Sequence, residues 1–177
     1  VGIFIHAETN QKDVQQFEGA IRFGGNYPLG SYRSMTSALG ANIGLDLRFN
    51  YDDLPLDFGV AIDVVATSYN FHKPDYNFQY DTYTTLGITY CSNYNFRQGY
   101  KVNPYVGAGL GYAYNYYNYH SNNIEKNSFI FVPKVGVELF YHLRFEGSLI
   151  LCRKYFNCVS LTAGVVIGGR PRKSKYK

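Results

Sequence analysis

Apolar and polar residues alternate with a period of two along much of the chain. In residues 38–49 every odd-numbered position is apolar, whereas the even-numbered positions are small, polar or charged and include Asp46 and Arg48. A period of two indicates a β-strand, because successive side chains point to opposite faces. Full charges on one face are unusual for a strand that only covers a soluble core. The pattern therefore predicts a transmembrane β-barrel with lipid outside and a packed polar interior.

The same alternation predicts eight strands, at residues 16–24, 38–49, 56–67, 79–92, 104–117, 128–140, 143–153 and 158–168. We expect an all-β fold, an eight-stranded antiparallel up-and-down transmembrane β-barrel. An even number of strands brings both ends of the barrel to one side. Residues 25–37, 68–79, 117–128 and 153–157 are then predicted outer loops, and 50–55, 93–103 and 141–142 predicted inner turns. Pro133 interrupts the sixth strand, where we expect a β-bulge.

Under this assignment, the outward-facing aromatic residues fall into two groups, one near each end of the barrel. Such girdles at both membrane interfaces are typical of transmembrane barrels, whereas a soluble sandwich has no reason to form them. The predicted inner girdle holds Phe17, Phe49, Phe58, Tyr90, Tyr141 and Phe145. The predicted outer girdle holds Phe23, Tyr80, Tyr112, Tyr114, Tyr116, Phe129 and Phe131.

Charged residues of the inward rows predict an ion-pair network in the lumen. Its members are Glu18, Arg22, Asp46, Arg48, Asp57, Asp63, Lys134, Glu138, Arg144 and Glu146. Buried charges need partners, and we expect Arg48 to face Asp57 and Glu138 to face Arg144. Side chains can just fill a barrel of eight strands, so we predict a plugged lumen. A proton or ion path along the same residues is the alternative.

Charge is concentrated at the end of the chain. Of the 17 Lys and Arg residues, five lie in the last eight positions, and the preceding body holds 12 basic and 13 acidic residues. The body therefore shows no basic face for nucleic acid. We divide the chain into a leader of residues 1–15, a barrel of residues 16–169 and a basic tail of residues 170–177, which is either a solvated tail or an expression remnant. Residues 1–7 look like the end of a signal peptide, which would imply export; a short leader is the alternative.

Cysteine and histidine give few candidates for chemistry. Cys152 and Cys158 flank residues 153–157 and are expected to face each other, either as a disulfide or as two reduced thiols. The four histidines, at positions 6, 72, 120 and 142, have no metal-ligand spacing. His120 and Ser121 have no fixed orienting acid, so we expect no catalytic residue, metal or cofactor.

Two segments carry a family resemblance. Residues 104–112, PYVGAGLGY, resemble a recurring strand of small outer-membrane β-barrels of the OmpA/OmpX/OmpW type, and residues 131–139, FVPKVGVEL, resemble the strand that usually follows. The resemblance covers residues 16–169 and implies the outer membrane of a Gram-negative bacterium and assembly by the barrel-insertion machinery. Residues 162–167 are similar to the C-terminal insertion signal, although the usual terminal aromatic is absent. Lipid A-modifying members carry a His-x-Ser site, which residues 120–122 do not match.

The predicted function is that of a non-enzymatic outer-membrane barrel for surface interaction or envelope integrity. It would contact outer-membrane lipid as a monomer, and its loops would meet host or surface ligands. Aromatic contact area, or simple interface anchoring, would come from Tyr27, Tyr32, Arg33, Tyr69, Phe71, Tyr76, Tyr116, Tyr117 and Tyr119. The alternatives are a narrow pore for small or apolar solutes, a lipid-modifying outer-membrane enzyme, and a soluble ligand carrier.

Overall fold

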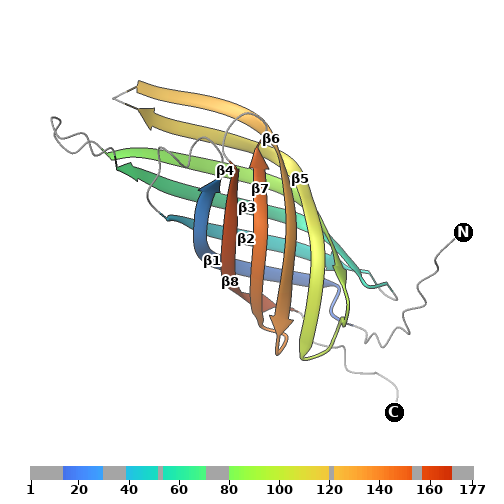
Figure 1. The fold of residues 1–177 in the computed structure, drawn as a ribbon. Coiled ribbons are helices and arrows are strands. Elements are labelled where there is room, and N and C mark those ends of the chain that lie inside the picture. The colour runs from blue at the N-terminus through green and yellow to red at the C-terminus, as the bar shows by residue number, and fades with distance from the viewer. Residues whose placement is uncertain are drawn as a thin grey trace, which may run out of the picture.

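The computed structural model describes residues 14–29, 39–51, 54–70, 80–119, 122–152 and 157–168. Eight antiparallel strands form a closed barrel in sequence order, and β1 pairs with both β2 and β8 (Figure 1). The strands are β1 (Phe17–Leu29), β2 (Gly40–Asn50), β3 (Leu56–Asn70), β4 (Tyr80–Asn95), β5 (Val102–Tyr119), β6 (Asn122–Leu139), β7 (Leu143–Cys152) and β8 (Asn157–Ile167). The predicted fold class is confirmed. Within the described ranges, no helix has the length and apolarity needed to cross a membrane.

Alternation decides which side of the barrel wall each side chain faces. In β2, Leu45 and Leu47 expose 51% and 72% of their surface, whereas Asp46 between them exposes 3%. The same parity holds in the neighbouring strands, where Ile21 and Ile62 point outward and Arg22 is buried. Large apolar side chains therefore cover the outside of the cylinder, and charged side chains lie in its bore.

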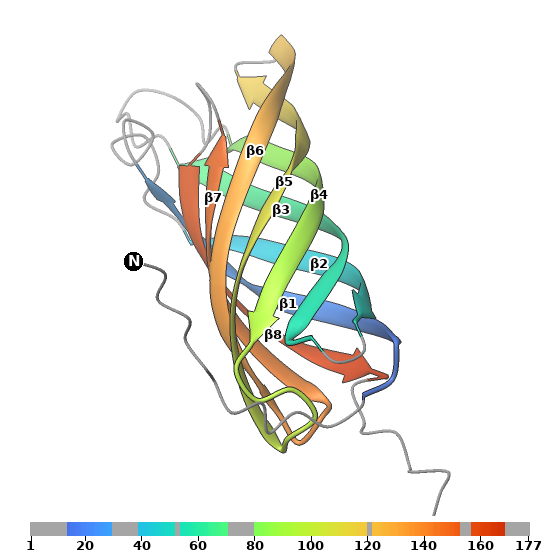
Figure 2. The same cartoon turned by 90° about the vertical axis from the view of Figure 1, so that its right-hand side faces the viewer.

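The strands reach further at the outer end than their alternation predicts. β5 and β6 pair without a break from Val102 with Leu139 to Tyr119 with Asn122, so the predicted outer loop at 117–128 is wrong. β7 pairs with β6 only as far as Ile130, and Figure 2 shows the β5–β6 hairpin rising beyond the rest of the barrel. The segment is rich in Asn and Tyr, a composition typical of loops, but continuous cross-strand pairing with β4 and β6 keeps it extended.

Several residues assigned to loops therefore lie in strands. These are Tyr27, Tyr69, Tyr116, Tyr117 and Tyr119. Tyr32, Arg33, Phe71 and Tyr76 lie outside the described residues.

Pro133 interrupts a ladder without shifting it. On the β7 side, no pair is formed by Val132 or Pro133, yet the pairs before and after them, Phe131 with Leu151 and Lys134 with Ser148, keep one register. Equal numbers of residues separate these pairs on the two strands, so the expected bulge is wrong. The proline only removes hydrogen bonds from an otherwise continuous strand.

Candidate functional site in the barrel interior

Arg22 of β1 stands at the centre of the lumen and contacts carboxylates from three other strands. Its Nη2 donates to Asp46 Oδ1 at 2.9 Å and to Asp63 Oδ1 at 3.0 Å, and its Nη1 donates to Glu146 Oε1 at 2.9 Å. These four residues face the lumen from β1, β2, β3 and β7 and meet there, although they are up to 124 positions apart in the sequence. One guanidinium thus holds strands from opposite sides of the barrel.

Glu146 links Arg22 to a second set of contacts. Its Oε2 accepts a hydrogen bond from the Tyr105 hydroxyl at 2.8 Å and lies 3.5 Å from Arg144 Nη2 and 3.8 Å from Lys134 Nζ. Arg144 donates from Nε to the Tyr105 oxygen at 2.6 Å, and its guanidinium lies 4.0 Å from the centre of the Tyr105 ring. The three basic and three acidic side chains of this central group, completed by Asp46 and Asp63, balance in charge.

Arg48 organises a second group nearer the inner end. Its Nη2 lies 3.0 Å from Glu18 and 3.6 Å from Glu138, and its Nη1 lies 3.6 Å from Asp57. The predicted pairing of Arg48 with Asp57 is therefore present. Glu138 does lie opposite Arg144 in register, but its ion pair is with Arg48, and Arg144 turns to Glu146 and Tyr105 instead. Long side chains can contact each other across a narrow lumen as readily as they contact the residue opposite them on the neighbouring strand.

Amide side chains close the inner end below Arg48. Asp57 accepts hydrogen bonds from Asn93 at 2.5 Å and Asn95 at 2.9 Å. Gln98, in the turn between β4 and β5, is buried and donates to Asn50 Oδ1 at 3.1 Å. The long inner turn thus folds inward over the bore.

Residues just before β1 also pack at this end. Val14 is buried, and the carbonyl of Gln15 accepts a hydrogen bond from the Asn50 amide at 2.8 Å. The last residues of the predicted leader therefore contribute to the barrel end.

An apolar layer crosses the lumen on the outer side of Arg22. It consists of Val65, Tyr83, Ala113, Ile130, Ile150, Cys152 and Cys158, all buried. Next to this layer, Asn115 accepts hydrogen bonds from Tyr83 at 2.5 Å and Thr85 at 2.9 Å and donates to Ser128 at 3.0 Å. The packed polar interior expected from the sequence is thus interrupted by an apolar layer at this height.

The two candidate cysteines do not face each other. Cys158 lies opposite Ile150, so Cys152 is its diagonal neighbour, and both sulfurs are thiols. Diagonal pairs in a sheet are about 7–8 Å apart, beyond the usual reach of a disulfide, about 4.4–6.8 Å between Cα atoms. Both thiols instead pack in the apolar layer.

Most of the predicted girdle residues lie on the outer wall. At the inner edge, Phe17, Phe49, Tyr51, Phe58 and Tyr90 form a chain of ring contacts with centroids 5.3 to 6.4 Å apart. Phe145 is exposed in β7, and Tyr141 lies in the turn between β6 and β7 with φ of 68°. At the outer edge the rings of Tyr112 and Phe129 are 5.6 Å apart. Exposed positions are also held by Phe23, Tyr114 and Phe131, whereas Tyr116 is half-buried and Tyr80 lies at the start of β4.

Sequence reasoning missed Tyr105, Tyr83 and Gln98. Tyr105 lies two positions before the inward-facing Gly107 on β5, so its side chain points into the lumen. The alternation alone was sufficient to find it. Gly136 on β6 leaves room for it, because a Cβ there would collide with the Tyr105 ring. Gln98 carried no periodic signal because it lies in a turn.

In the described ranges, no three His, Cys, Asp or Glu residues are arranged to hold a metal ion.

Comparison with known proteins places this geometry in a structural class. No protein-family model matches the sequence, and no curated protein does. Among solved structures, Neisserial surface protein A is 17% identical with a TM-score of 0.60, over 89% of this chain and 99% of that one. Ail, the attachment invasion locus protein of Yersinia pestis, solved with the heparin analogue sucrose octasulfate, is 14% identical with a TM-score of 0.55, over 86% and 99%. The chain therefore has the fold of the small eight-stranded outer-membrane β-barrels.

Proposed function

We propose that the protein is a non-enzymatic barrel of a Gram-negative outer membrane whose lumen is plugged by its own side chains. The observation that carries the proposal is the stacking of three layers in the bore. The Arg48 group with its amide contacts lies innermost, the Arg22 group follows, and the apolar layer around Tyr83 and Ile130 lies above it. An ion crossing the bore would have to break buried ion pairs and then enter an apolar zone, and both steps are costly.

Membrane insertion is supported by the inverted distribution of polarity. Residues such as Leu47, Leu110 and Leu161 are exposed on the outer wall, while Arg22, Arg48 and Arg144 are buried. In water, such an exterior would drive aggregation, whereas in a bilayer it meets hydrocarbon. The structural neighbours are also small outer-membrane barrels, which supports the same location. We expect the chain to insert as a monomer through the barrel-insertion machinery.

Planar-bilayer conductance tests the plug. The purified protein, refolded in detergent and shown to be folded by heat-modifiable gel migration, is added to a bilayer at neutral pH. We expect no steady current above the bilayer background, because an ion would have to separate the buried ion pairs and enter the apolar layer. A reproducible open-channel current from the folded protein would overturn the plugged lumen and favour the narrow-pore alternative.

A role in surface contact is supported by the outer end of the barrel. The β5–β6 hairpin projects beyond β7 and presents exposed Glu125, Lys126 and Asn127 along an edge that β7 does not cover. An exposed projecting hairpin offers polar side chains and backbone groups to another chain. Adherence of producing cells to host cells or to each other should fall when this hairpin is shortened. Unchanged adherence would remove the hairpin from that role.

A further inference from the structure

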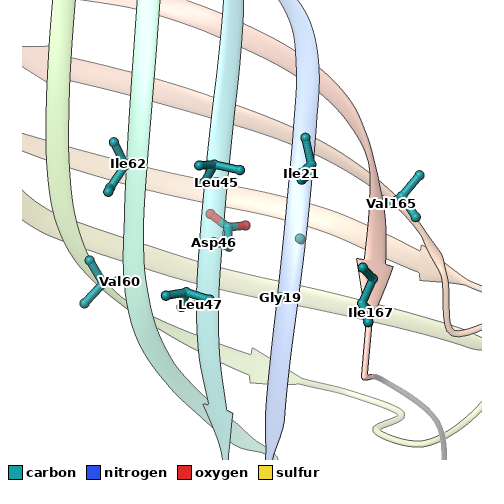
Figure 3. A pocket seen from close by; sticks show the side chains of 10 residues that line it. Gly19, Ile21, Leu45, Asp46, Leu47, Val60, Ile62, Val165 and Ile167 are labelled. Carbon is teal, nitrogen blue, oxygen red and sulfur yellow. The ribbon is translucent and has the colours of Figure 1, made fainter.

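An apolar groove runs over the outer wall where β8, β1, β2 and β3 lie side by side (Figure 3). Its upper part has a volume of about 330 Å³ and is lined mainly by Ile21, Leu45, Ile62 and Val165. Its lower part, about 670 Å³, reaches the inner edge at Phe17 and Gly168. Four residues line both parts, which makes one continuous groove: Gly19, Leu47, Val60 and Ile167.

Gly19 forms the floor of this groove. Its register neighbours are Leu47 on β2 and Ile167 on β8, and both side chains project from the wall. The hollow therefore exists because one outward position between two large side chains is empty. A Cβ at position 19 would lie 3.9 Å from the Asp46 carbonyl oxygen and 4.0 Å from Leu47 Cδ2, so barrel packing does not require glycine there.

We propose that this groove binds an acyl chain of an anionic glycerophospholipid from the inner leaflet, an inference that rests on the proposed membrane location. Almost all of the lining is hydrocarbon, and it lies on the wall that faces the bilayer. A flexible hydrocarbon chain fills a narrow furrow and buries more of its own surface than on the neighbouring wall.

The inner end of the groove has the chemistry for an anionic headgroup. The groove ends among Phe17, Phe58 and Tyr90, aromatic residues of the kind that lie at headgroup height in membranes. Gly168 lines this end, and the chain continues with basic residues at 170, 172, 173, 175 and 177. Such clusters attract anionic lipid phosphates.

Photo-crosslinking tests the site in the full chain. The protein is inserted in vesicles of phosphatidylglycerol and phosphatidylcholine, with one lipid at a time carrying a diazirine on its acyl chain. We expect wild-type crosslinks to map to the groove strands and to be stronger with phosphatidylglycerol. Gly19→Leu fills the floor and should lower labelling there at least roughly tenfold, the effect of displacing about two methylene groups.

Two further variants separate the parts of the proposal. Gly25→Leu adds the same side chain to an outward, open position of β1 outside the groove and should label like wild type. Changing the five basic tail residues to Gln should bring phosphatidylglycerol labelling down to that of phosphatidylcholine.

Three results would overturn the proposal. They are equal labelling of Gly19→Leu and wild type, equal labelling by both lipids in wild type, and chain-to-chain crosslinks through Gly19, which would assign the groove to a second copy. Heat-modifiable migration in the same vesicles reports insertion separately. A folded, inserted barrel without groove labelling would remove only the lipid site, whereas a chain that never inserts would remove the proposed function as well.

Discussion

Arg22 shows how much a single residue can hold together in this barrel. Three carboxylates from three different strands share its guanidinium at 2.9 to 3.0 Å. Glu146 has further basic neighbours, whereas Asp46 and Asp63 form their ion pairs with Arg22. Without this side chain, buried like charges would face each other in a medium that screens them poorly.

Replacing Arg22 by Met keeps the volume and removes the charge. We expect the free energy of unfolding to fall by about 3–5 kcal/mol, the usual effect of breaking a buried ion pair from one side. Denaturant titration of the protein in detergent micelles or vesicles, followed by gel migration, measures it.

Arg97→Gln is the matched control for the loss of one arginine. Arg97 lies in the inner turn, exposed, with its guanidinium 5.0 Å from the centre of the Tyr100 ring. Its removal should change the free energy of unfolding by no more than about 0.5 kcal/mol. Equal unfolding midpoints for Arg22→Met and the wild type would show that the central group does not stabilise the barrel.

At the scale of elements, the β5–β6 hairpin combines two parts with different roles. The part up to Asn115 belongs to the barrel, because Asn115 ties β4, β5 and β6 through Tyr83, Thr85 and Ser128. The part beyond it pairs only with β4 on one side and has no β7 partner on the other. We therefore expect stability to depend on the first part and not on the projecting end.

Shortening the hairpin in two steps tests this division. Replacing residues 117–124 by Asn-Gly, a two-residue hairpin turn, should leave heat-modifiable migration intact. Replacing residues 115–126 by Asn-Gly also removes Asn115 and leaves Tyr83 and Thr85 without their acceptor, at a cost of about 1–3 kcal/mol in the free energy of unfolding. If the shorter replacement alone prevented folding, the projecting end would be part of the barrel's structural core.

At the scale of the whole molecule, an even number of strands fixes where the ends lie. β1 starts and β8 ends at the same end of the barrel, where Gly19 pairs with Ile167, and the β5–β6 connection lies at the opposite end. Insertion with short turns toward the periplasm would place the tip of this hairpin outside the cell.

Epitope tags test which end of the barrel faces the outside of the cell. A tag between Tyr119 and Asn122 should react with antibody on intact producing cells of a Gram-negative host. A tag after Lys177 should react only after the outer membrane is permeabilised. Surface reaction of the C-terminal tag on intact cells would reverse the proposed orientation.

The sequence by itself determined the number of strands, their order and which residues face in or out. Alternation is a local property with a period of two, so the parity of Leu45, Asp46 and Leu47 can be read without any other strand. The pairing of Arg48 with Asp57 also followed, because these residues lie close across one hairpin.

Only the tertiary structure decided the contacts across the bore and the exact registers. Glu138 joins Arg48 rather than Arg144, and Cys158 faces Ile150 rather than Cys152, because register depends on pairing along whole strands. The apolar layer at Tyr83 and the furrow at Gly19 arise where strands distant in sequence curve together. Closure of the cylinder creates these neighbours, and no local pattern encodes them.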